Sequence, residues 1–593
     1  MDDSRLRCDR LLADLRPHPR LIVDQARLAE IRELAAKDAF AATAMRNAFT
    51  EVKALRALPP PTLPLKEGLS LTKQTLDLLT TCALAWRLDR DPIAFATARD
   101  RLVAICSQSA WNRDNFLAIG ELAYALAIGY DWLRDDLADA DRELVRGYLV
   151  KAILKQGLAA YDEGDWWIDS AINWNHECNG GLIIAALAVA DSDPDLARAI
   201  IPRAVRWFDG ALDSYEPDGA WDEGAGYWYR ATVFSIYALA AMESALGSDF
   251  GLSERRGLAM TGAFYLASVG PTGLLARYAD CSEDCRLRNQ VPALLWLARR
   301  YDRPEFARAE IADAERAGPT AAHLLWYRPT AAAPQLHLDH CFRGTGPVAM
   351  LRSAWDDPLA VFMWLKGGNN QVNHGHLDQG NFEFDALGQR WVRDLGTDDY
   401  GLPGYFERAP GGRRWNYFRL NSQSHSVPLI DGANQQPAAI VRITGFLADP
   451  VSPRAVADLS EAYKPAAKLA RRGVMLVERR AGLVQDEFTL AGPCRFTWAL
   501  TTDADIAIHG TTATLTLGGE RLVATLLEPA GAEFTQASAE RPPPESANTA
   551  VKRLLIDLPR AQGRLRIAVL LAPCWPDGNL VTVPALRPLG CWF

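Results

Sequence analysis

Residues 373–378 read Asn-His-Gly-His-Leu-Asp, so two of the chain's nine histidines flank a single glycine. His374 and His376 are two residues apart, and on a β-strand this spacing puts both side chains on one face. Two such imidazoles can bind a metal ion, or one can bind while the other moves protons. A chance pair of surface histidines has the same pattern, and the pair alone does not exclude it.

Two further residues can complete a metal site with a histidine of this segment. Asp394 lies in the stretch RWVRDLGT (390–397), and His425 lies in NSQSHS (421–426). Two histidines and one carboxylate suit zinc and leave one coordination position open or filled by water. Taken singly, Asp394 is equally a turn carboxylate before Gly396, and His425 is equally a hydrogen-bonded surface histidine.

An Asn- and His-rich segment, NWNHECNGG (173–181), begins an apolar helix. Asn175, His176 and Asn179 fall within one helical turn, where we expect them to face one side. Neutral amide and imidazole donors suit a carboxylate that is bound without a full ion pair. Helix capping by an asparagine is the simpler alternative.

A tyrosine pair follows a glycine-rich approach in DGAWDEGAGYWYR (218–230). Tyr227 or Tyr229 can act as general acid or base in a cleft if its pKa is lowered. Ordinary aromatic packing is the alternative. Asp222 and Glu223 are adjacent and therefore point in different directions, so they make a poor pair of glycosidase carboxylates.

The segments 173–181 and 218–230 lie in the first half of the chain, where the sequence predicts helices. From about 20 to 330, apolar residues come in helical blocks such as 116–133, 181–189, 232–246 and 291–301, each closed by Gly, Pro or Asp. Many helices with short connections predict stacked antiparallel helix pairs. The segment 315–345 has little periodicity and carries Pro329 and Pro334, so it is the expected domain boundary.

Short strands replace helices after about residue 345. The runs 348–352, 360–366, 381–385, 473–479, 511–517 and 564–571 are rich in β-forming residues, and 512–517 (TATLTL) alternates strictly. Many short strands without intervening helices predict an antiparallel sandwich. We therefore expect an α+β chain of two domains, 1–335 helical and 336–593 β-sandwich, with an exposed loop at 536–550.

Composition excludes several classes of function. The chain has 593 residues, 49% apolar and 23% charged, with a net charge of −9 and scattered Lys and Arg. A nucleic-acid-binding protein needs a basic stripe, so no nucleic acid partner is expected. No signal-peptide h-region and no uninterrupted membrane span are visible, which predicts no membrane partner and a cytoplasmic location, or a periplasmic one if a signal was trimmed. The ten cysteines are dispersed and predict buried free thiols.

These four segments, in this order, resemble the heparinase II/III-like polysaccharide lyases, which include heparin lyases II and III and the exolytic oligoalginate lyases. The most specific stretches are NHGHLDQGNFEFDALGQRWVRDLG (373–396) and RLNSQSHSVPLIDG (419–432). The segments NWNHECNGG (173–181) and DEGAGYWY (222–229) match over shorter lengths. The resemblance covers nearly the whole chain and implies an (α/α) toroid followed by an antiparallel β-sandwich.

The resemblance also implies roles for individual residues. It makes His374 the proton-transfer histidine and gives the carboxylate-neutralising role to Asn175 or His176. It places the catalytic tyrosine at Tyr227 or Tyr229, with Tyr227 preferred. The implied zinc ligands, which would organise the site, are His376, Asp394 and His425. The residues expected to contact substrate are Trp174, Asn179, Glu223 and Arg230, although many relatives have a second Tyr where this chain has Arg230.

The implied reaction is β-elimination on an acidic, uronate-containing oligo- or polysaccharide of the glycosaminoglycan or alginate type, giving C4–C5 unsaturated products. Exolytic action on short chains follows from the absence of a visible signal peptide. Three alternatives remain open: a uronyl C5-epimerase, a non-catalytic carbohydrate-binding protein on the same scaffold, and a metal-dependent glycan hydrolase. The sequence does not choose between a monomer and a homodimer.

Overall fold

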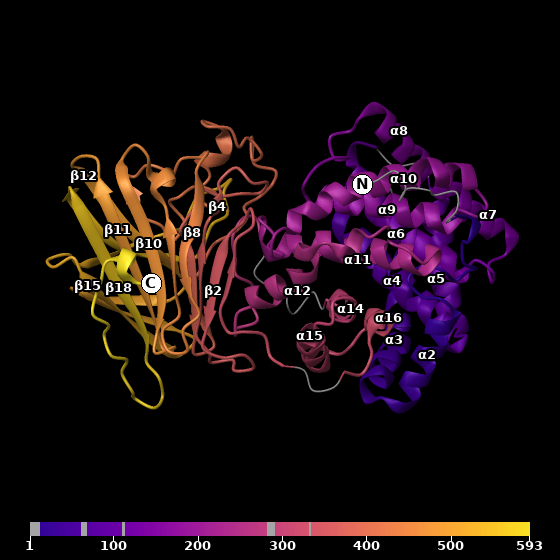
Figure 1. Cartoon of the computed structure of the whole chain (residues 1–593), viewed down its shortest axis with the longest axis horizontal. Coiled ribbons are helices and arrows are strands. Elements are labelled where there is room, and N and C mark those ends of the chain that lie inside the picture. The colour runs from indigo at the N-terminus through magenta and orange to yellow at the C-terminus, as the bar shows by residue number, and fades with distance from the viewer. Residues whose placement is uncertain (1–11, 61–67, 109–112, 282–290, 331–333) are drawn as a thin grey trace. The chain divides into compact units, whose positions relative to one another are not determined.

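A computed structural model describes residues 12–60, 68–108, 113–281, 291–330 and 334–593 (Figure 1). The chain divides into two compact units, and each is described by itself. Unit 1 comprises Met1–Glu216, Tyr229–Gly262 and Gln290–Pro334, and unit 2 comprises Pro217–Trp228, Ala263–Asn289 and Gln335–Phe593. The division near Pro334 lies at the predicted domain boundary. The segments 217–228 and 263–289 differ from the prediction, because they cluster with the strand-rich part of the chain.

Unit 1 is built of helices (Figure 1). They are α2 (Gln25–Lys37), α3 (Ala39–Ala57), α4 (Gly68–Asp89), α5 (Pro92–Cys106), α6 (Phe116–Leu133), α7 (Asp139–Tyr148), α8 (Lys155–Glu163), α9 (Asn173–Val189), α10 (Pro194–Ala211), α14 (Ala293–Arg300), α15 (Pro304–Ala317) and α16 (Ala321–Trp326). Two more, α11 (Gly224–Leu246) and α12 (Arg256–Ser268), have residues in both units.

Helix α6 is the centre of this unit, and every one of its residues is buried. Alone among the described helices it is long and apolar enough to cross a membrane, but its whole length lies inside the fold, which is the burial of a core helix. It packs closely on α9 through glycines. A Cβ on Gly181 would lie 2.3 Å from the carbonyl oxygen of Gly120, so only glycine permits this approach. The close contact fixes α9 and the Asn- and His-rich segment that begins it.

Unit 2 contains antiparallel sheets. Its strands are β1 (His340–Phe342), β2 (Val348–Arg352), β3 (Phe362–Lys366), β4 (Gly368–Asn369), β5 (Phe382–Ala386), β6 (Gln389–Val392), β7 (Leu429–Ile430), β8 (Ile440–Leu447), β9 (Arg454–Asp458), β10 (Ala467–Val477), β11 (Ala481–Leu490), β12 (Cys494–Thr502), β13 (Asp505–His509), β14 (Thr512–Leu517), β15 (Glu520–Glu528), β16 (Phe534–Ser538), β17 (Lys552–Ala561) and β18 (Arg564–Pro573). The described residues form sheets in the order β1-β2-β3-β5-β6, β13-β14-β15-β18-β11-β10-β9-β8-β4 and β16-β17-β12-β7.

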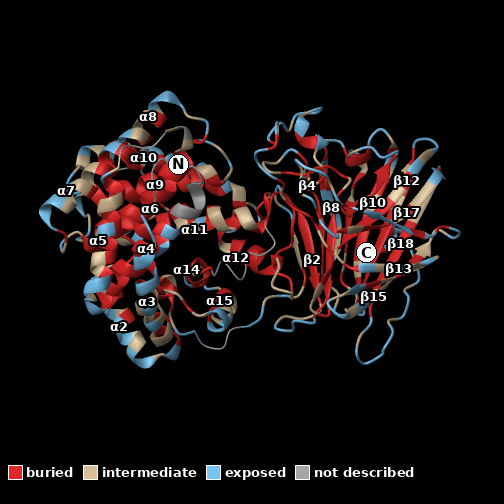
Figure 2. Cartoon of the chain, turned by 180° about the vertical axis from the view of Figure 1, so that it is seen from behind, coloured by how far each residue is buried: buried red, intermediate tan, exposed pale blue. Residues whose placement is uncertain are grey.

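One hydrophobic core joins the three sheets. It includes Phe384 and Trp391 from the first sheet, Val484 from the second and Trp498 from the third. Burial is concentrated between the strand layers and within the helices, while the loops are exposed (Figure 2). The helical first half and the antiparallel second half confirm the predicted fold class. The predicted loop at 536–550 begins later than expected, because β16 extends to Ser538.

Candidate functional site

The His374 loop connects β4 to β5 in unit 2. His374 has φ +57°, a left-handed conformation that is rare for a residue with a Cβ. Gly375 follows, and a Cβ there would lie 2.9 Å from the carbonyl oxygens of Asn370 and Val372. The prediction that His374 and His376 share one face of a strand is therefore wrong, because the backbone turns sharply between them. Strain of this kind concentrates at functional sites.

A buried carboxylate, Asp280, nevertheless brings the two histidines together. Its oxygens lie 2.6 Å from His374 Nδ1 and 2.9 Å from His376 Nε2. The Tyr405 hydroxyl donates to the same carboxylate at 2.8 Å, and an Arg414 Nη2 donates at 3.3 Å. Burial by itself would raise the pKa of Asp280, but the bonds from His374 and His376 and the charge of Arg414 outweigh it and hold the pKa well below its ordinary value. Asp280 is therefore ionised.

Ionised Asp280 fixes the protonation pattern of both rings. A carboxylate only accepts hydrogen bonds, so the proton of His374 lies on Nδ1 and that of His376 lies on Nε2. His374 Nε2 points away from this bond, and it is the ring atom that can take a proton from a substrate when the ring is neutral. His376 is left with a lone pair on Nδ1, which is buried and has no hydrogen-bond partner among the described residues.

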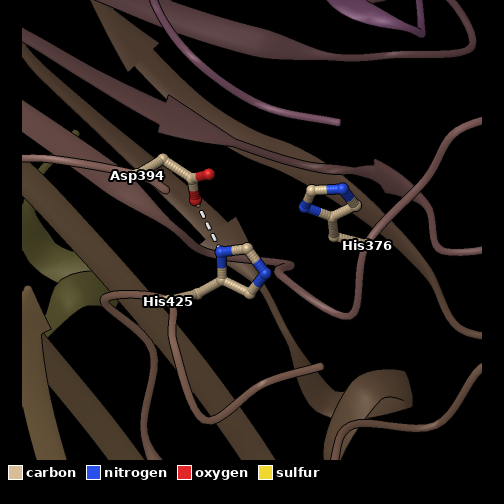
Figure 3. A group of neighbouring side chains, drawn as sticks. All are labelled: His376, Asp394 and His425. Atoms are coloured by element: carbon tan, nitrogen blue, oxygen red, sulfur yellow. Dashed lines mark hydrogen bonds and ion pairs between the residues drawn. The ribbon is translucent and has the colours of Figure 1, made fainter. Parts of the chain in front are cut away.

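His376, Asp394 and His425 form the predicted metal-binding group (Figure 3). They offer ligand atoms that all lie within 4.8 Å of one another, and all three residues are buried. Besides His376 Nδ1, His425 Nε2 is also a buried nitrogen without a hydrogen-bond partner in the described part of the chain. Unpartnered buried polar atoms are costly in an apolar interior. Two imidazole nitrogens and a carboxylate, held in this way, fit Zn²⁺.

Hydrogen bonds orient the carboxylate of this group. His425 Nδ1 lies 2.5 Å from Asp394 Oδ2, the contact drawn in Figure 3, and Asn381 Nδ2 donates to the same oxygen at 2.6 Å. The Gly396 amide donates to Oδ1 at 2.7 Å. Burial raises the pKa of Asp394, but His425, His376 and the Gly396 amide outweigh it and hold the pKa well below its ordinary value. Asp394 is therefore negatively charged, as a metal ligand needs to be.

Tyr227 lies against His374. Its ring stacks on the His374 ring, with centroids 4.4 Å apart and planes inclined by 16°. Its hydroxyl is 2.7 Å from the Tyr400 hydroxyl, which in turn lies 3.5 Å from His374 Nδ1. Burial, followed by the neighbouring Tyr400 and Asp280, raises the pKa of Tyr227 well above its usual value. Tyr227 is therefore a protonated phenol, a state that suits a general acid.

Glu223 is hydrogen-bonded to the His374 loop through Asn373. It is fully buried, and it accepts hydrogen bonds from Asn373 Nδ2 at 2.8 Å and from Trp221 Nε1 at 3.2 Å. Burial raises the pKa of Glu223 well above its ordinary value, and the charge of Asp222 adds to the effect. In this conformation both Glu223 oxygens accept hydrogen bonds from the protein's own donors, and its contact with substrate stays a prediction.

Asn175 and Asn179, which lie in unit 1, share one face of α9, as predicted from their spacing. Asn179 Nδ2 donates to Asn175 Oδ1 at 2.7 Å, and Tyr161 donates to Asn179 Oδ1 at 2.5 Å. Asn175 Nδ2 donates to the carbonyls of Ile168, Ser170 and Trp207. Both residues are buried, so in this conformation their amides hold the backbone around α9 together.

His176 does not share that face. It follows Asn175 directly, and successive helical residues differ by about 100° in direction. Its Nδ1 lies 2.8 Å from the Ser235 hydroxyl, and its ring contacts Phe208 and Tyr215 edge-on. The residue is fully buried, and burial lowers the pKa of His176 to about 3. The prediction that all three residues present one surface is therefore wrong for His176.

Arg230 belongs to an ionic cluster of unit 1. Its guanidinium donates to Glu121 and, at 3.1 Å, to Glu177, and both carboxylates are buried. Tyr229, the residue before it, carries the Lys73 ammonium 5.4 Å above its ring. Trp174 pairs with the exposed Trp166 at 4.7 Å between ring centroids. Of the predicted substrate contacts, Trp174 is thus the one beside an exposed aromatic side chain.

Sequence reasoning did not find Asp280, Tyr400, Tyr405 or Arg414. Asp280 is 94 residues away from His374, and Tyr400 is 173 residues away from Tyr227. No local spacing links them. The sequence around Asp280, YADCSEDC (278–285), has no motif that marks the aspartate as part of a site. The resemblance carried no motif at these positions.

Comparison with known proteins agrees with this picture. Residues 359–565 match the family model described as heparinase II/III-like, C-terminal, which confirms the predicted resemblance over the strand-rich part of the chain. The heparan sulfate lyase HepC from Pedobacter heparinus is similar in structure, with a TM-score of 0.58, 14% identity and coverage of 93% of this chain and 92% of that one. A heparinase III structure gives a TM-score of 0.56 at 12% identity, with the same coverage of each chain. A search of curated proteins gives no match. At these identities the structural similarity establishes the fold, a toroid followed by a sandwich.

Proposed function

Because residues 359–565 match the heparinase II/III-like C-terminal model, we propose that this protein is a polysaccharide lyase that cleaves uronate-containing glycans by β-elimination. The observation that carries the proposal is the stacked pair of His374 and Tyr227. One member has an imidazole lone pair held ready by Asp280, and the other is a protonated phenol. A base and an acid in contact are what β-elimination requires.

The chemistry follows from the two side chains. His374 Nε2 takes the proton from C5 of the uronate, the C4–O bond breaks, and Tyr227 protonates the leaving oxygen while a C4–C5 double bond forms. The C5 proton is only weakly acidic, so the base must be neutral and correctly aimed. Asp280 meets both needs, because it fixes the tautomer of His374 and stabilises the imidazolium that forms. The Tyr400 hydroxyl hydrogen-bonds the Tyr227 hydroxyl. The cycle closes when the His374 imidazolium gives up the proton it took from C5 and the Tyr227 phenolate regains one from solvent.

The resemblance assigns carboxylate binding to Asn175 and His176. In unit 1 both are buried and bonded to their own neighbours, so the function proposed here rests on the residues of unit 2. Trp174 of unit 1 lies beside the exposed Trp166, and such indole rings can stack on a sugar ring.

We propose that His376, Asp394 and His425 hold Zn²⁺. When bound, zinc would supply a fixed positive charge that ties these three side chains together. His376 would then be held on one ring nitrogen as a ligand and on the other by Asp280. A carboxylate behind a metal-bound histidine fixes the orientation of the ring. Asp280 therefore connects the metal group to the proton-transfer histidine through one carboxylate.

The finer expectations of exolytic action, and of a glycosaminoglycan or alginate type of substrate, are part of the same proposal. The experiment is an ultraviolet assay on a panel of defined oligouronates of alginate, heparan, chondroitin and hyaluronan type, with products separated by length. Unsaturated products released one terminal unit at a time would support exolytic action, and a ladder of intermediate lengths would indicate internal cleavage. Saturated products, or an epimerised chain without unsaturation, would overturn the lyase assignment.

A further inference from the structure

A cavity in unit 1 is rich in arginine. It has a volume of about 600 Å³ and lies where the first turn of α2 meets α14 and the end of α16. The arginines that line it are Arg16, Arg27, Arg299, Arg300 and Arg328. Three carboxylates line it as well, Asp24, Glu30 and Glu243, which leaves an excess of two positive charges in a chain whose net charge is −9. Like charges gathered in a recess need a compensating partner.

Glu30 is shared between two of the arginines. It lies 2.8 Å from Arg27 Nη1 and 2.6 Å from Arg328 Nη2. Arg27 also donates to the carbonyls of Leu324 and Tyr327, so its guanidinium is anchored to the backbone. One carboxylate therefore serves two cations, and neither of the other carboxylates has a described ion pair with an arginine of the cavity.

Arg328 and Arg299 can each donate further hydrogen bonds. Arg328 Nη1 is buried without a hydrogen-bond partner among the described residues. Burial, followed by the charges of Arg27 and Arg299, lowers the pKa of Arg328 to about 10, against the pull of Glu30. Arg299 is exposed and makes no described ion pair or hydrogen bond in the part of the chain the structure covers. An unsatisfied buried N–H beside an unpaired cation is the arrangement that an oxyanion would complete.

The cavity is larger than an inorganic ion requires. Trp296 and Trp326 contribute to its wall, and Arg299, Trp326 and Arg328 also line an adjoining cavity of about 250 Å³. A recess of this size fits a small organic molecule. Planar guanidinium forks match the oxygen pairs of carboxylates, sulfates and phosphates. The aromatic wall gives a non-polar body a surface to contact.

We propose that this cavity, the arginine pocket, binds a small organic anion of about the size of one sugar, held by its carboxylate, sulfate or phosphate group on Arg299 and Arg328. The pocket is made entirely of unit 1 residues. It therefore does not depend on the function proposed for the His374 group.

Isothermal titration calorimetry on the full chain tests the pocket, with glucuronate, inorganic sulfate and inorganic phosphate as probes. Arg299→Ala and Arg328→Ala should each weaken binding of the preferred probe by about tenfold or more, because each removes a charge-assisted hydrogen-bond donor. Arg328→Lys should recover part of the loss, because it restores the charge without the fork. Arg203→Ala is the matched control, since Arg203 is a half-exposed arginine of unit 1 that pairs with Asp162 outside the pocket.

Preference among the probes identifies the chemical group, with glucuronate binding above sulfate and phosphate marking a sugar acid. Circular dichroism confirms that each variant is folded. Saturable binding that is lost in both arginine variants and kept in Arg203→Ala supports the pocket. No saturable binding of any probe to the unaltered protein, or equal binding by the alanine variants, overturns it.

Discussion

Each compact unit buries carboxylates, and the two groups differ in the side chains that bond to them. In unit 1, Arg230 matches Glu121 and Glu177, and Asn173 donates to Glu177 at 2.7 Å. In unit 2, Asp280 is met by two histidines, a tyrosine and an arginine. In unit 1 the ionic groups therefore pair with one another. The arrangement in unit 2 holds two imidazoles, each by one ring nitrogen, and leaves the other nitrogen of each ring outside the bond to Asp280.

This difference shows how a buried polar residue that could react can be distinguished from one that only supports the fold. Histidine and asparagine types recur in both units, so residue type does not decide. What decides is whether a reactive atom is oriented and left without an internal partner. In unit 2, His376 Nδ1 and His425 Nε2 are buried without a hydrogen-bond partner among the described residues, whereas the Asn175 amide in unit 1 already donates to backbone carbonyls.

The largest expected effect comes from the base. His374→Ala should lower kcat by about 10³- to 10⁴-fold, because it removes the group that takes the C5 proton. The fold should persist, since His374 lies in a loop. Ultraviolet detection of unsaturated product on the preferred oligouronate measures the loss, and circular dichroism checks the fold. Near-normal turnover would remove His374 from the mechanism.

The tyrosines come next. Tyr227→Phe should lower kcat by roughly 10²-fold, because the phenol that protonates the leaving oxygen is lost. Tyr229→Phe is the matched control from the same helix, and we expect it to change kcat by less than about threefold, as is usual for a residue outside the reacting group. The reverse ranking, measured in the same assay, would transfer the acid role to Tyr229.

Asp280 should have two effects at once. Asp280→Asn should lower kcat by about 10- to 100-fold and weaken zinc binding by a similar factor, because one carboxylate supports both His374 and His376. Metal analysis and competition with a chromogenic chelator give the second value without any substrate. Asp577→Asn, an exposed aspartate on a loop, serves as the control. A loss of turnover with unchanged zinc affinity would break the proposed link between the two histidines.

The metal group is tested by its own stoichiometry. His425→Ala should lose bound zinc, because only two of the three ligands remain. The exposed His509→Ala should keep the zinc content of the unaltered protein. Elemental analysis of purified protein gives the ratio, and a fall in thermal midpoint should accompany the loss. If the unaltered protein takes up no zinc under saturating conditions, the site is not a zinc site.

The smallest effect concerns unit 1 and is seen in stability. Burial lowers the pKa of His176 to about 3 in the folded chain, whereas a histidine in the unfolded chain titrates near 6.5. As pH falls, His176 is therefore protonated in the unfolded chain before it is protonated in the folded chain. The free energy of unfolding should be highest, as far as His176 is concerned, above about pH 6.5 and should fall between about pH 6.5 and 3. The loss should reach a few kcal/mol at most. Urea unfolding against pH should show it, and His176→Gln should flatten the curve. An unchanged pH slope in that variant would place the histidine in a more solvated setting.

Much of the fold could be predicted because local patterns are strong. The apolar run 116–133 is α6 residue for residue, and the alternation of 512–517 is β14. The site was predicted only in part. Local spacing found His374 and His376, but it assigned them to a strand, because a left-handed residue leaves no mark in the sequence. Asp280 could not be found, because only folding brings it beside a histidine 94 residues away.

The central claim is that Asp280 acts by holding His374 for proton transfer. A double-mutant cycle on these two residues, measured as kcat for unsaturated product formation, tests it most directly. The account predicts that Asp280→Asn slows the unaltered enzyme but adds almost nothing in the His374→Ala background, since Asp280 then has no base to hold. Multiplicative losses in the double variant would show that the two residues act independently and would contradict the account.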